Sequence, residues 1–264
     1  MRLRLLGQGI IAPGMPDWDT AVPVLRGAVP YHVAPMRPPP PQGLPMNERR
    51  RARLTTRLAL EASRQAMDIS ELSEPERAQL QTVFASSDGD MQLIDAMCRD
   101  IYQQQTSPSP TTFHNSVHNA VAGYWAIAEG CRAASTSLAA ADGTFAAGLL
   151  EAVTQAIADD RPVLLVAFDV PGPPLLDPHR HFAAAFACAL LFRPLAKGGD
   201  GVALSVDLAE GTGSTAMDNP DLEAIRMGNP AARALPLLQA MALGGRHRLR
   251  LPYLDDLHLE LRLT

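Results

Sequence analysis

The segment from Phe145 to Val153 places the strongest constraint on what this chain can fold into. Its sequence, FAAGLLEAV, carries small or apolar residues on every side of the helix that it predicts. A helix that is apolar all round is buried between layers of structure rather than laid on a surface. The mostly apolar run PVLLVAFDV, from Pro162 to Val170, then predicts a buried strand. Together the two segments indicate a layered fold of helices and sheet.

Strand-like and helix-like segments alternate along the rest of the chain. Helices are expected over residues 47–67, 88–104, 118–130, 142–160 and 229–243. Strands are expected over residues 3–11, 80–86, 135–141, 162–170, 181–192, 201–208 and 256–264. Residues 107–117 and the proline-rich segment 35–45 predict loops, since proline suits neither a helix interior nor a central strand. This alternation indicates an α/β fold in which helices pack on a mixed sheet.

The composition fits one well-buried domain covering residues 1–264. Hydrophobic residues make up 47% of the chain, charged residues 19%, and the formal net charge is −5. Such a chain is globular, and its mild acidity argues against a nucleic-acid binder, which would usually be basic. Cys98, Cys131 and Cys188 lie far apart, which favours free thiols in a reducing cytoplasm. No apolar run is long enough to span a membrane, and the first residues favour a strand over a signal peptide.

Several motifs occur in a fixed order along the chain. An N-x-x-A-G motif at Asn119, Ala122 and Gly123 is followed by the strand and turn STSLAAADG. Upstream lie LGQGIIAPG at residues 6–14 and RLTTRLALEAS at residues 53–63. Together these segments resemble the N-terminal half of the β-ketoacyl synthases, over roughly residues 1–210. In particular they are similar to the short chain-length-factor-like ketosynthases of aryl polyene pathways. The resemblance implies a thiolase-like layered fold, shortened relative to full ketosynthases and divergent from about residue 210.

The residue at the nucleophile position departs from that family. The family's turn reads T-A-C-x-S, and Asp142 falls on the cysteine, at the start of the predicted helix 142–160. A helix N-terminus raises the thiolate fraction of a cysteine, but a carboxylate is a weak nucleophile. EGTGSTAM only faintly resembles the family's H-G-T-G-T motif, with Glu210 in place of the histidine. The resemblance therefore implies a subunit without catalytic residues, in which Asp142 could simply cap the helix.

The segment before and into the 118–130 helix is expected to meet a partner. In the family this segment lies at the dimer seam, beside the end of the acyl tunnel. The candidate tunnel and interface residues are Phe113, His114, Val117, His118, Asn119, Val121 and Tyr124. Of these, Phe113, Val117 and Val121 are expected nearest the tunnel. The resemblance thus implies a heterodimer with an active β-ketoacyl synthase, in which this chain limits the length of the product.

An arginine cluster is the main basic feature of this otherwise acidic chain. Arg49, Arg50, Arg53 and Arg57 lie at the start of the predicted helix 47–67. They could form a solvated helix face or a docking patch for an acyl carrier protein. Nucleic acid is a weaker candidate because aromatic residues are not interleaved with the arginines.

Metal and hydrolase sites have less support. His114 and His118 are spaced i, i+4, which on a helix would place two metal ligands on one face. However, His114 falls in the predicted loop and no third ligand is evident, while His179 and His181 fit a solvated loop. We therefore expect neither a metal nor a cofactor. The serines before Asp142 lack the G-x-S-x-G turn of a serine hydrolase.

The sequence favours a non-catalytic chain-length-factor subunit in polyene or fatty-acid-type biosynthesis. Two alternatives stay open. One is an acyl decarboxylase or transferase that uses Asp142 as acid or base, and the other is a structural scaffold without lipid function. An orphan subunit should be unstable or aggregate when purified alone, whereas a free-standing enzyme should form a well-behaved oligomer.

Overall fold

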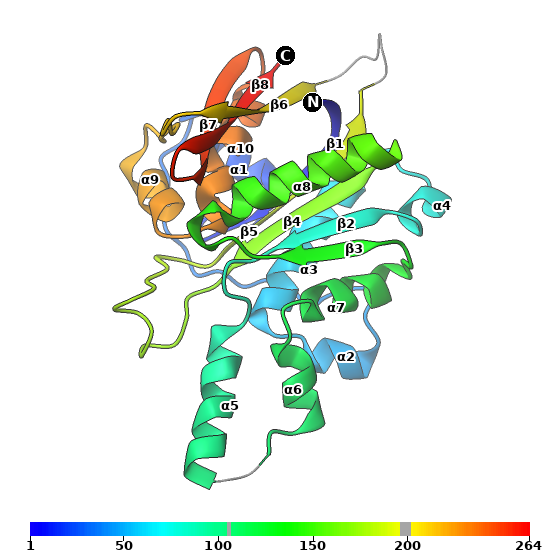
Figure 1. The fold of residues 1–264 in the computed structure, drawn as a ribbon, viewed down its shortest axis with the longest axis vertical. Coiled ribbons are helices and arrows are strands. Elements are labelled where there is room, and N and C mark those ends of the chain that lie inside the picture. The colour runs from blue at the N-terminus through cyan, green and yellow to red at the C-terminus, as the bar shows by residue number, and fades with distance from the viewer. Residues whose placement is uncertain (105–106, 196–201) are drawn as a thin grey trace.

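The structure, a computed structural model, describes residues 1–104, 107–195 and 202–264. Within these residues, eight strands form one mixed sheet in the order β3-β2-β4-β5-β1-β6-β8-β7 (Figure 1). The strands are β1 (Arg2–Ile11), β2 (Gln81–Ala85), β3 (Ser135–Leu138), β4 (Val163–Asp169), β5 (Phe186–Pro194), β6 (Ala203–Glu210), β7 (His247–Leu254) and β8 (Leu257–Leu263). β2 runs parallel to β3 and β4, and the other neighbouring strands are antiparallel. This mixed sheet confirms the expected fold class.

Helices cover both faces of the sheet (Figure 1). On one face α8 (Thr144–Asp159) packs across β2, β4 and β5, with α1 (Trp18–Leu25) and α10 (Leu235–Leu243) in the same core. On the other face α3 (Leu54–Ile69) packs across β1, β4 and β5, and α7 (Ala120–Glu129) packs on α3. The other helices are α2 (Met46–Arg51), α4 (Glu74–Arg77), α5 (Met91–Gln104), α6 (Pro110–Ser116), α9 (Pro220–Met227) and the 3₁₀ helices η1 (Ala141–Gly143) and η2 (Ala231–Ala234). No described helix is long and apolar enough to cross a membrane.

Strand β4 supplies side chains to two separate cores. Val163, Leu165 and Ala167 pack on the α8 side, and Leu164, Val166 and Phe168 pack on the α3 side. Every residue of β4 is buried. The continuous apolar run of this strand is therefore explained by burial on both faces. The expectation that α8 is buried between layers is likewise confirmed, because eight of its residues are buried.

Helix α3 lies directly on the backbone of β1. A Cβ atom at Gly7 would lie 2.0 Å from the carbonyl oxygen of Ala66, and one at Gly9 would lie 2.1 Å from that of Ala62. Only glycine permits such a close approach of helix and strand. The contact is completed by Gln65, whose Oε1 accepts a hydrogen bond from the Ile10 N–H at 3.0 Å.

The two edges of the sheet differ. At the outer edge of β7, Thr215 pairs with Arg250: its N–H donates to the Arg250 carbonyl and its Oγ1 accepts from the Arg250 N–H, each at 2.9 Å. At the opposite edge, β3 pairs with β2 and with no other described strand. The polar backbone of β3 is therefore open along one side.

Several expected elements differ in the structure. Residues 107–117 were expected to form a loop, but Pro110 to Ser116 form α6. The Ser109 hydroxyl accepts from the Thr112 N–H, and proline suits the first helical position. The expected helix 47–67 is broken where Ala52 is extended, between α2 and α3. Both differences arise from local signals at helix ends, and neither changes the layered arrangement of helices and sheet.

The C-terminal part departs further from expectation. β7 was not predicted at all, because its burial alternates with exposed arginines and Pro252. β5 begins only at Phe186, so residues 171–185 form a long loop rather than part of a strand. The helix expected over 229–243 starts as the 3₁₀ turn η2 before α10.

The contact between α3 and β1 can be tested with one added methyl group. Gly9→Ala should lower the free energy of unfolding by about 1–3 kcal/mol, because the new Cβ forces α3 away from the sheet. Gly123→Ala on α7 is the matched control, since nothing lies within 4 Å of its Cβ position. That substitution should instead raise the free energy of unfolding by about 0.5–1 kcal/mol through helix propensity. Denaturant unfolding of both variants measures the difference, and equal effects would contradict the close contact.

Candidate functional site

The parallel strands β2, β3 and β4 end at the same edge of the sheet. Such edges are where ligand sites form in α/β folds. Three polar segments meet there: the turn from Ser86 to Asp90 after β2, Asp142 after β3, and Asp169 at the end of β4. We therefore take this edge as the candidate functional site.

The turn from β3 into α8 is strained and carries no thiol. Ala141 has a φ of 47°, a left-handed conformation that is unusual for a residue with a Cβ atom. Thr144 fixes the turn: its Oγ1 accepts from the Ala140 N–H at 2.9 Å and donates to the Ala141 carbonyl at 2.6 Å. Neither η1 nor α8 has a side-chain cap, so Asp142 does not serve as the helix cap that was considered from the sequence.

Asp142 is instead bound by an arginine from the long loop after β4. Arg180 Nη1 donates to Asp142 Oδ1 at 2.7 Å, and Arg180 Nε donates to Asp88 Oδ2 at 3.1 Å. The same guanidinium also donates to Ser87 Oγ and lies 5.0 Å from the centre of the Phe182 ring. One arginine therefore joins the turn after β2, the turn after β3 and the loop 171–185.

A depression of about 690 Å³ opens above this turn. It is lined by Ala140, Ala141, Asp142, Gly143, Arg180, Arg233, Pro252, Tyr253, Leu254, Asp255 and Asp256. The Asp142 side chain is 67% exposed to it. Arg233 is half-buried and makes no ion pair with a described carboxylate. Burial and the neighbouring Arg226 lower the pKa of Arg233 from its ordinary value. The depression is thus polar, with charges of both signs on its walls.

Asp169 is the buried acid of this region, and the sequence analysis did not single it out. Its side chain is fully buried, and Oδ1 accepts from Ser86 Oγ at 3.0 Å and from the Ser87 N–H at 2.8 Å. Oδ2 is buried and has no hydrogen-bond partner among the described residues. Burial raises the pKa of this carboxyl group to about 7. The available signal was an acidic residue ending an otherwise apolar strand.

None of the three cysteines lines the depression at Asp142, and neither His114 nor His118 lines it. Cys98 is exposed on α5, whereas Cys131 and Cys188 are buried, and burial raises the pKa of the Cys188 thiol. His118 Nε2 lies 2.8 Å from the Ser86 carbonyl oxygen. His114 lies on α6, where its ring meets that of Tyr124 edge-on. Among the described residues, no three histidine, cysteine or acidic side chains are grouped as metal ligands.

The predicted tunnel residues are divided between the surface and the core. Helices α5 and α6 extend away from the body of the molecule (Figure 1), and on α6 Phe113 is 60% exposed. Val117, between α6 and α7, is 41% exposed. Val121 and Tyr124 are instead buried in the core of this chain, and Tyr124 donates to Asn115 Oδ1 at 2.8 Å. Asn119 is exposed just before α7. Of the three residues expected nearest the tunnel, two face outwards.

The arginine cluster is also divided. Arg49 and Arg50 are exposed on α2, whereas Arg53 is paired with Asp90. Arg57 donates to the Pro38 carbonyl and lies under the proline-rich segment. The open basic surface is therefore smaller than the sequence indicates.

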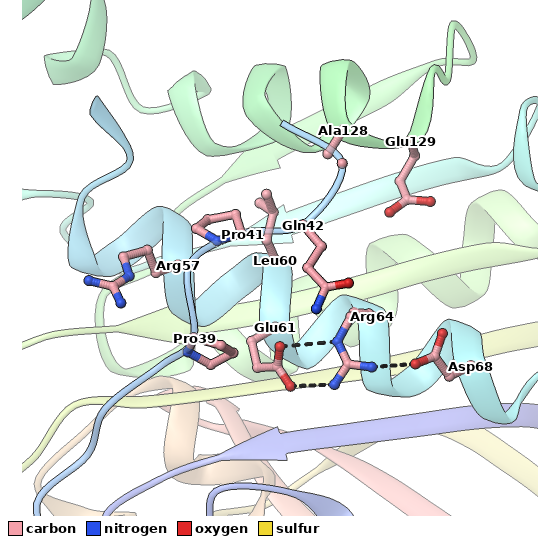
Figure 2. Close-up of a pocket in the computed structure, with 11 residues that line it drawn as sticks. Pro39, Pro41, Gln42, Arg57, Leu60, Glu61, Arg64, Asp68, Ala128 and Glu129 are labelled. Carbon is pink, nitrogen blue, oxygen red and sulfur yellow. Dashed lines mark hydrogen bonds and ion pairs between the residues drawn. The ribbon is translucent and has the colours of Figure 1, made fainter. Parts of the chain in front are cut away.

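Arg57 lines a groove of about 340 Å³ between that segment, α3 and the end of α7. Figure 2 shows Arg64 held between Glu61 and Asp68 on the floor of this groove, with the Glu129 carboxylate near its far wall. Burial raises the pKa of Glu129 from its ordinary value. The groove is separate from the edge that carries Asp142, because its lining residues come from other elements.

Comparisons with known proteins agree on one family. Residues 26–247 match the family model described as β-ketoacyl synthase, N-terminal domain. No curated protein matches the chain.

Solved structures share the fold at low sequence identity. A ketosynthase in complex with its chain length factor from Xenorhabdus doucetiae matches with 22% identity and a TM-score of 0.74, over 99% of each chain. The ishigamide ketosynthase/chain length factor matches with 14% identity and a TM-score of 0.71, over 100% of this chain and 99% of that one. A β-ketoacyl synthase from Burkholderia phymatum matches with 11% identity and a TM-score of 0.71, over the same shares. The helices packed on a mixed sheet thus form the thiolase-like fold of ketosynthases, and this chain belongs to the β-ketoacyl synthase family.

Proposed function

We propose that the chain is a non-catalytic chain-length-factor subunit, which pairs with an active β-ketoacyl synthase and shapes its acyl tunnel. The observation that carries this proposal is the turn between β3 and α8, where Ala141, Asp142 and Gly143 stand and no cysteine is present. A ketosynthase needs a thiolate there to hold the acyl chain. The frame that would present such a thiolate is retained, since α8 is buried and the turn before it is strained.

Arg180 also supports a non-catalytic function. It binds the Asp142 carboxylate and closes one side of the turn with a side chain from the loop 171–185. The residue at the place of the family's first histidine, Glu210, is exposed at the end of β6. The next residue, Gly211, donates its N–H to the Asp256 carbonyl at the rim of the depression. No cysteine and no histidine is among the residues that line the depression at Asp142.

Two surfaces support pairing with another chain. The α5–α6 projection exposes several large apolar side chains: Ile101 and Tyr102 on α5, the latter 86% exposed, Phe113 on α6, and Val117 just after α6. Exposed apolar and aromatic residues are typical of association surfaces. The open edge of β3 offers free backbone groups to a further strand. Two of the similar solved structures are of a ketosynthase with its chain length factor, and they motivate the kind of partner proposed.

One alternative keeps a specific observation in its favour. Asp142 is 67% exposed in the depression and could act as an acid or base in a decarboxylase or transferase. Its ion pair with Arg180 and the absence of a nearby thiol favour the non-catalytic function. No described contact favours a scaffold without lipid function.

The absence of acyl transfer is the first consequence to test. The chain alone, incubated with acyl carrier substrates, should show no acyl adduct by intact mass, because no activated nucleophile lies at the turn. Asp142→Asn should leave the product output of the assembled complex unchanged. A Cys98→Ser variant controls for adventitious acylation of the exposed thiol. A stable adduct that persists in this variant, or loss of output in Asp142→Asn, would favour the enzyme.

The second test concerns product length. Phe113→Ala should lengthen the product of the assembled complex while the heterodimer stays intact, because a smaller side chain at the tunnel end leaves more room. Tyr102→Ala, another exposed aromatic on the same projection, is the control and should not change the length. Mass spectrometry measures the product, and co-elution with the ketosynthase measures pairing. Unchanged length in both Phe113→Ala and Val117→Ala would exclude this segment from the tunnel.

The third test concerns the carrier protein. Arg50→Glu should weaken binding of the acyl carrier protein, because Arg50 is exposed and makes no ion pair with a described residue. The effect should shrink as salt rises, since exposed charges are screened. Arg161→Glu is the matched control, because Arg161 is also exposed but follows the C-terminal end of α8. Equal binding of the two variants at low salt would show that α2 is only a solvated helix face.

A further inference from the structure

The loop from Pro171 to Ala185 is long and has no helix or strand of its own. In Figure 1 it extends from the body between β4 and β5, in yellow-green. Loops of this length inside a compact fold are uncommon, and they are usually either functional or disordered. Its two ends meet in the sheet, where Asp169 pairs with Phe186. Asn229 joins them again by donating to the carbonyl oxygens of Asp169 at 3.2 Å and Ala184 at 2.8 Å.

The middle of the loop is held to the protein by Arg180. Its guanidinium binds Asp88, Asp142 and Ser87 Oγ, as described above. Ser87 is shared, because its N–H donates to Asp169 Oδ1 at 2.8 Å while its hydroxyl accepts from Arg180. Ser87 therefore takes part both in the contact that closes the loop and in the hydrogen bonding of Asp169 Oδ1.

Asp169 is poorly satisfied in this closed arrangement. Two donors reach Oδ1, but Oδ2 is buried without a partner among the described residues. An ionised carboxylate left in this way is costly, whereas a neutral acid loses much less on burial. The arrangement accordingly suits a protonated Asp169.

We propose that the loop 171–185 is a proton-dependent lid beside the depression at Asp142, with Arg180 as its latch and Asp169 as the group that holds the proton. Opening the lid exposes the stem of the loop, so that water reaches Asp169 Oδ2. The open state then tolerates the ionised carboxylate, and the closed state favours the neutral acid. This inference does not depend on the proposed function, because it concerns only contacts within the chain.

The direction of the pH dependence follows from linkage. Burial raises the pKa of Asp169 from 3.8 to about 7 in the closed state, and hydration restores its ordinary value in the open state. The proton therefore stabilises the closed lid fully below the ordinary pKa, and this stabilisation is lost as pH rises through about 7.

Several other charged and polar groups lie close to Asp169. The charge of Asp88 on the turn after β2 raises the pKa of Asp169, the backbone N–H of Asp88 lowers it, and the Asp88 carboxylate is itself paired with Arg180. His118, between α6 and α7, contacts the Ser86 carbonyl, and from the side of η2 the neighbour is the neutral Asn229. On β5, the residue paired with Asp169 is the uncharged Phe186.

Hydrogen exchange of peptides from the loop, measured by mass spectrometry on the full chain, tests the lid. After correction for intrinsic rates, the opening constant should rise roughly ten-fold between about pH 6 and about pH 8. Asp169→Asn should remove this rise, because the amide keeps a neutral group in place. Arg180→Gln should leave the loop open at both pH values, since the latch is lost.

Two further measurements test whether Asp169, rather than a histidine of the loop, causes the rise in the opening constant. His179→Gln/His181→Gln removes the histidines of the loop, including the His181–Asp177 pair, and should retain the ten-fold rise. Infrared spectroscopy of the unaltered chain should show the carbonyl band of a neutral carboxylic acid fading over the same pH range, and Asp169→Asn should lack this band. An opening constant that does not change with pH, a rise that survives in Asp169→Asn, or a rise that disappears with the histidines would overturn the proposal.

Discussion

Helix α3 rests on the bare backbone of β1, and this contact fixes the spacing of the layer behind the sheet. Because Gly7 and Gly9 carry no side chains, the carbonyl oxygens of Ala62 and Ala66 approach the strand directly. With α3 so close, the central strands must be apolar on both faces, and α8 closes the opposite side. The ends of β2, β3 and β4 lie at one edge because these strands run parallel. The polar turns that follow these strands meet there without needing a rigid structure of their own.

The parts that could be predicted from the sequence are those whose pattern repeats along the chain. The apolar run of β4 and the all-round apolar surface of α8 indicate directly that these two elements are buried. α6 was missed although Ser109 and Pro110 form a capping signal, because the prolines around them outweighed it. β7 was missed because its exposed arginines break the apolar run that marked the other strands. The hydrophobic pattern therefore predicted the layers of the fold better than it predicted short elements at the surface.

The candidate site was predictable only in part. Asp142 could be picked out by its place before α8, but its partner Arg180 lies in a loop whose course no periodicity describes. Asp88 and Asp169 reach the same network from segments far apart in sequence, which only the sheet topology brings together. Helical spacing also could not show whether Val121 and Tyr124 face a partner or the core of their own chain. A residue that faces a partner and a residue in the core of its own chain are both apolar, so the sequence does not distinguish them.

The two edges of the sheet differ in which backbone groups are open to a further strand. At the edge of β7, Thr215 already takes the backbone N–H and carbonyl of Arg250, which another strand would use. The edge at β3 has no second neighbour among the described strands. A filament that grows strand by strand needs two free edges on every member. In this sheet the open edge is at β3, while Thr215 already occupies the backbone groups of Arg250 on β7, so a further strand would add at β3.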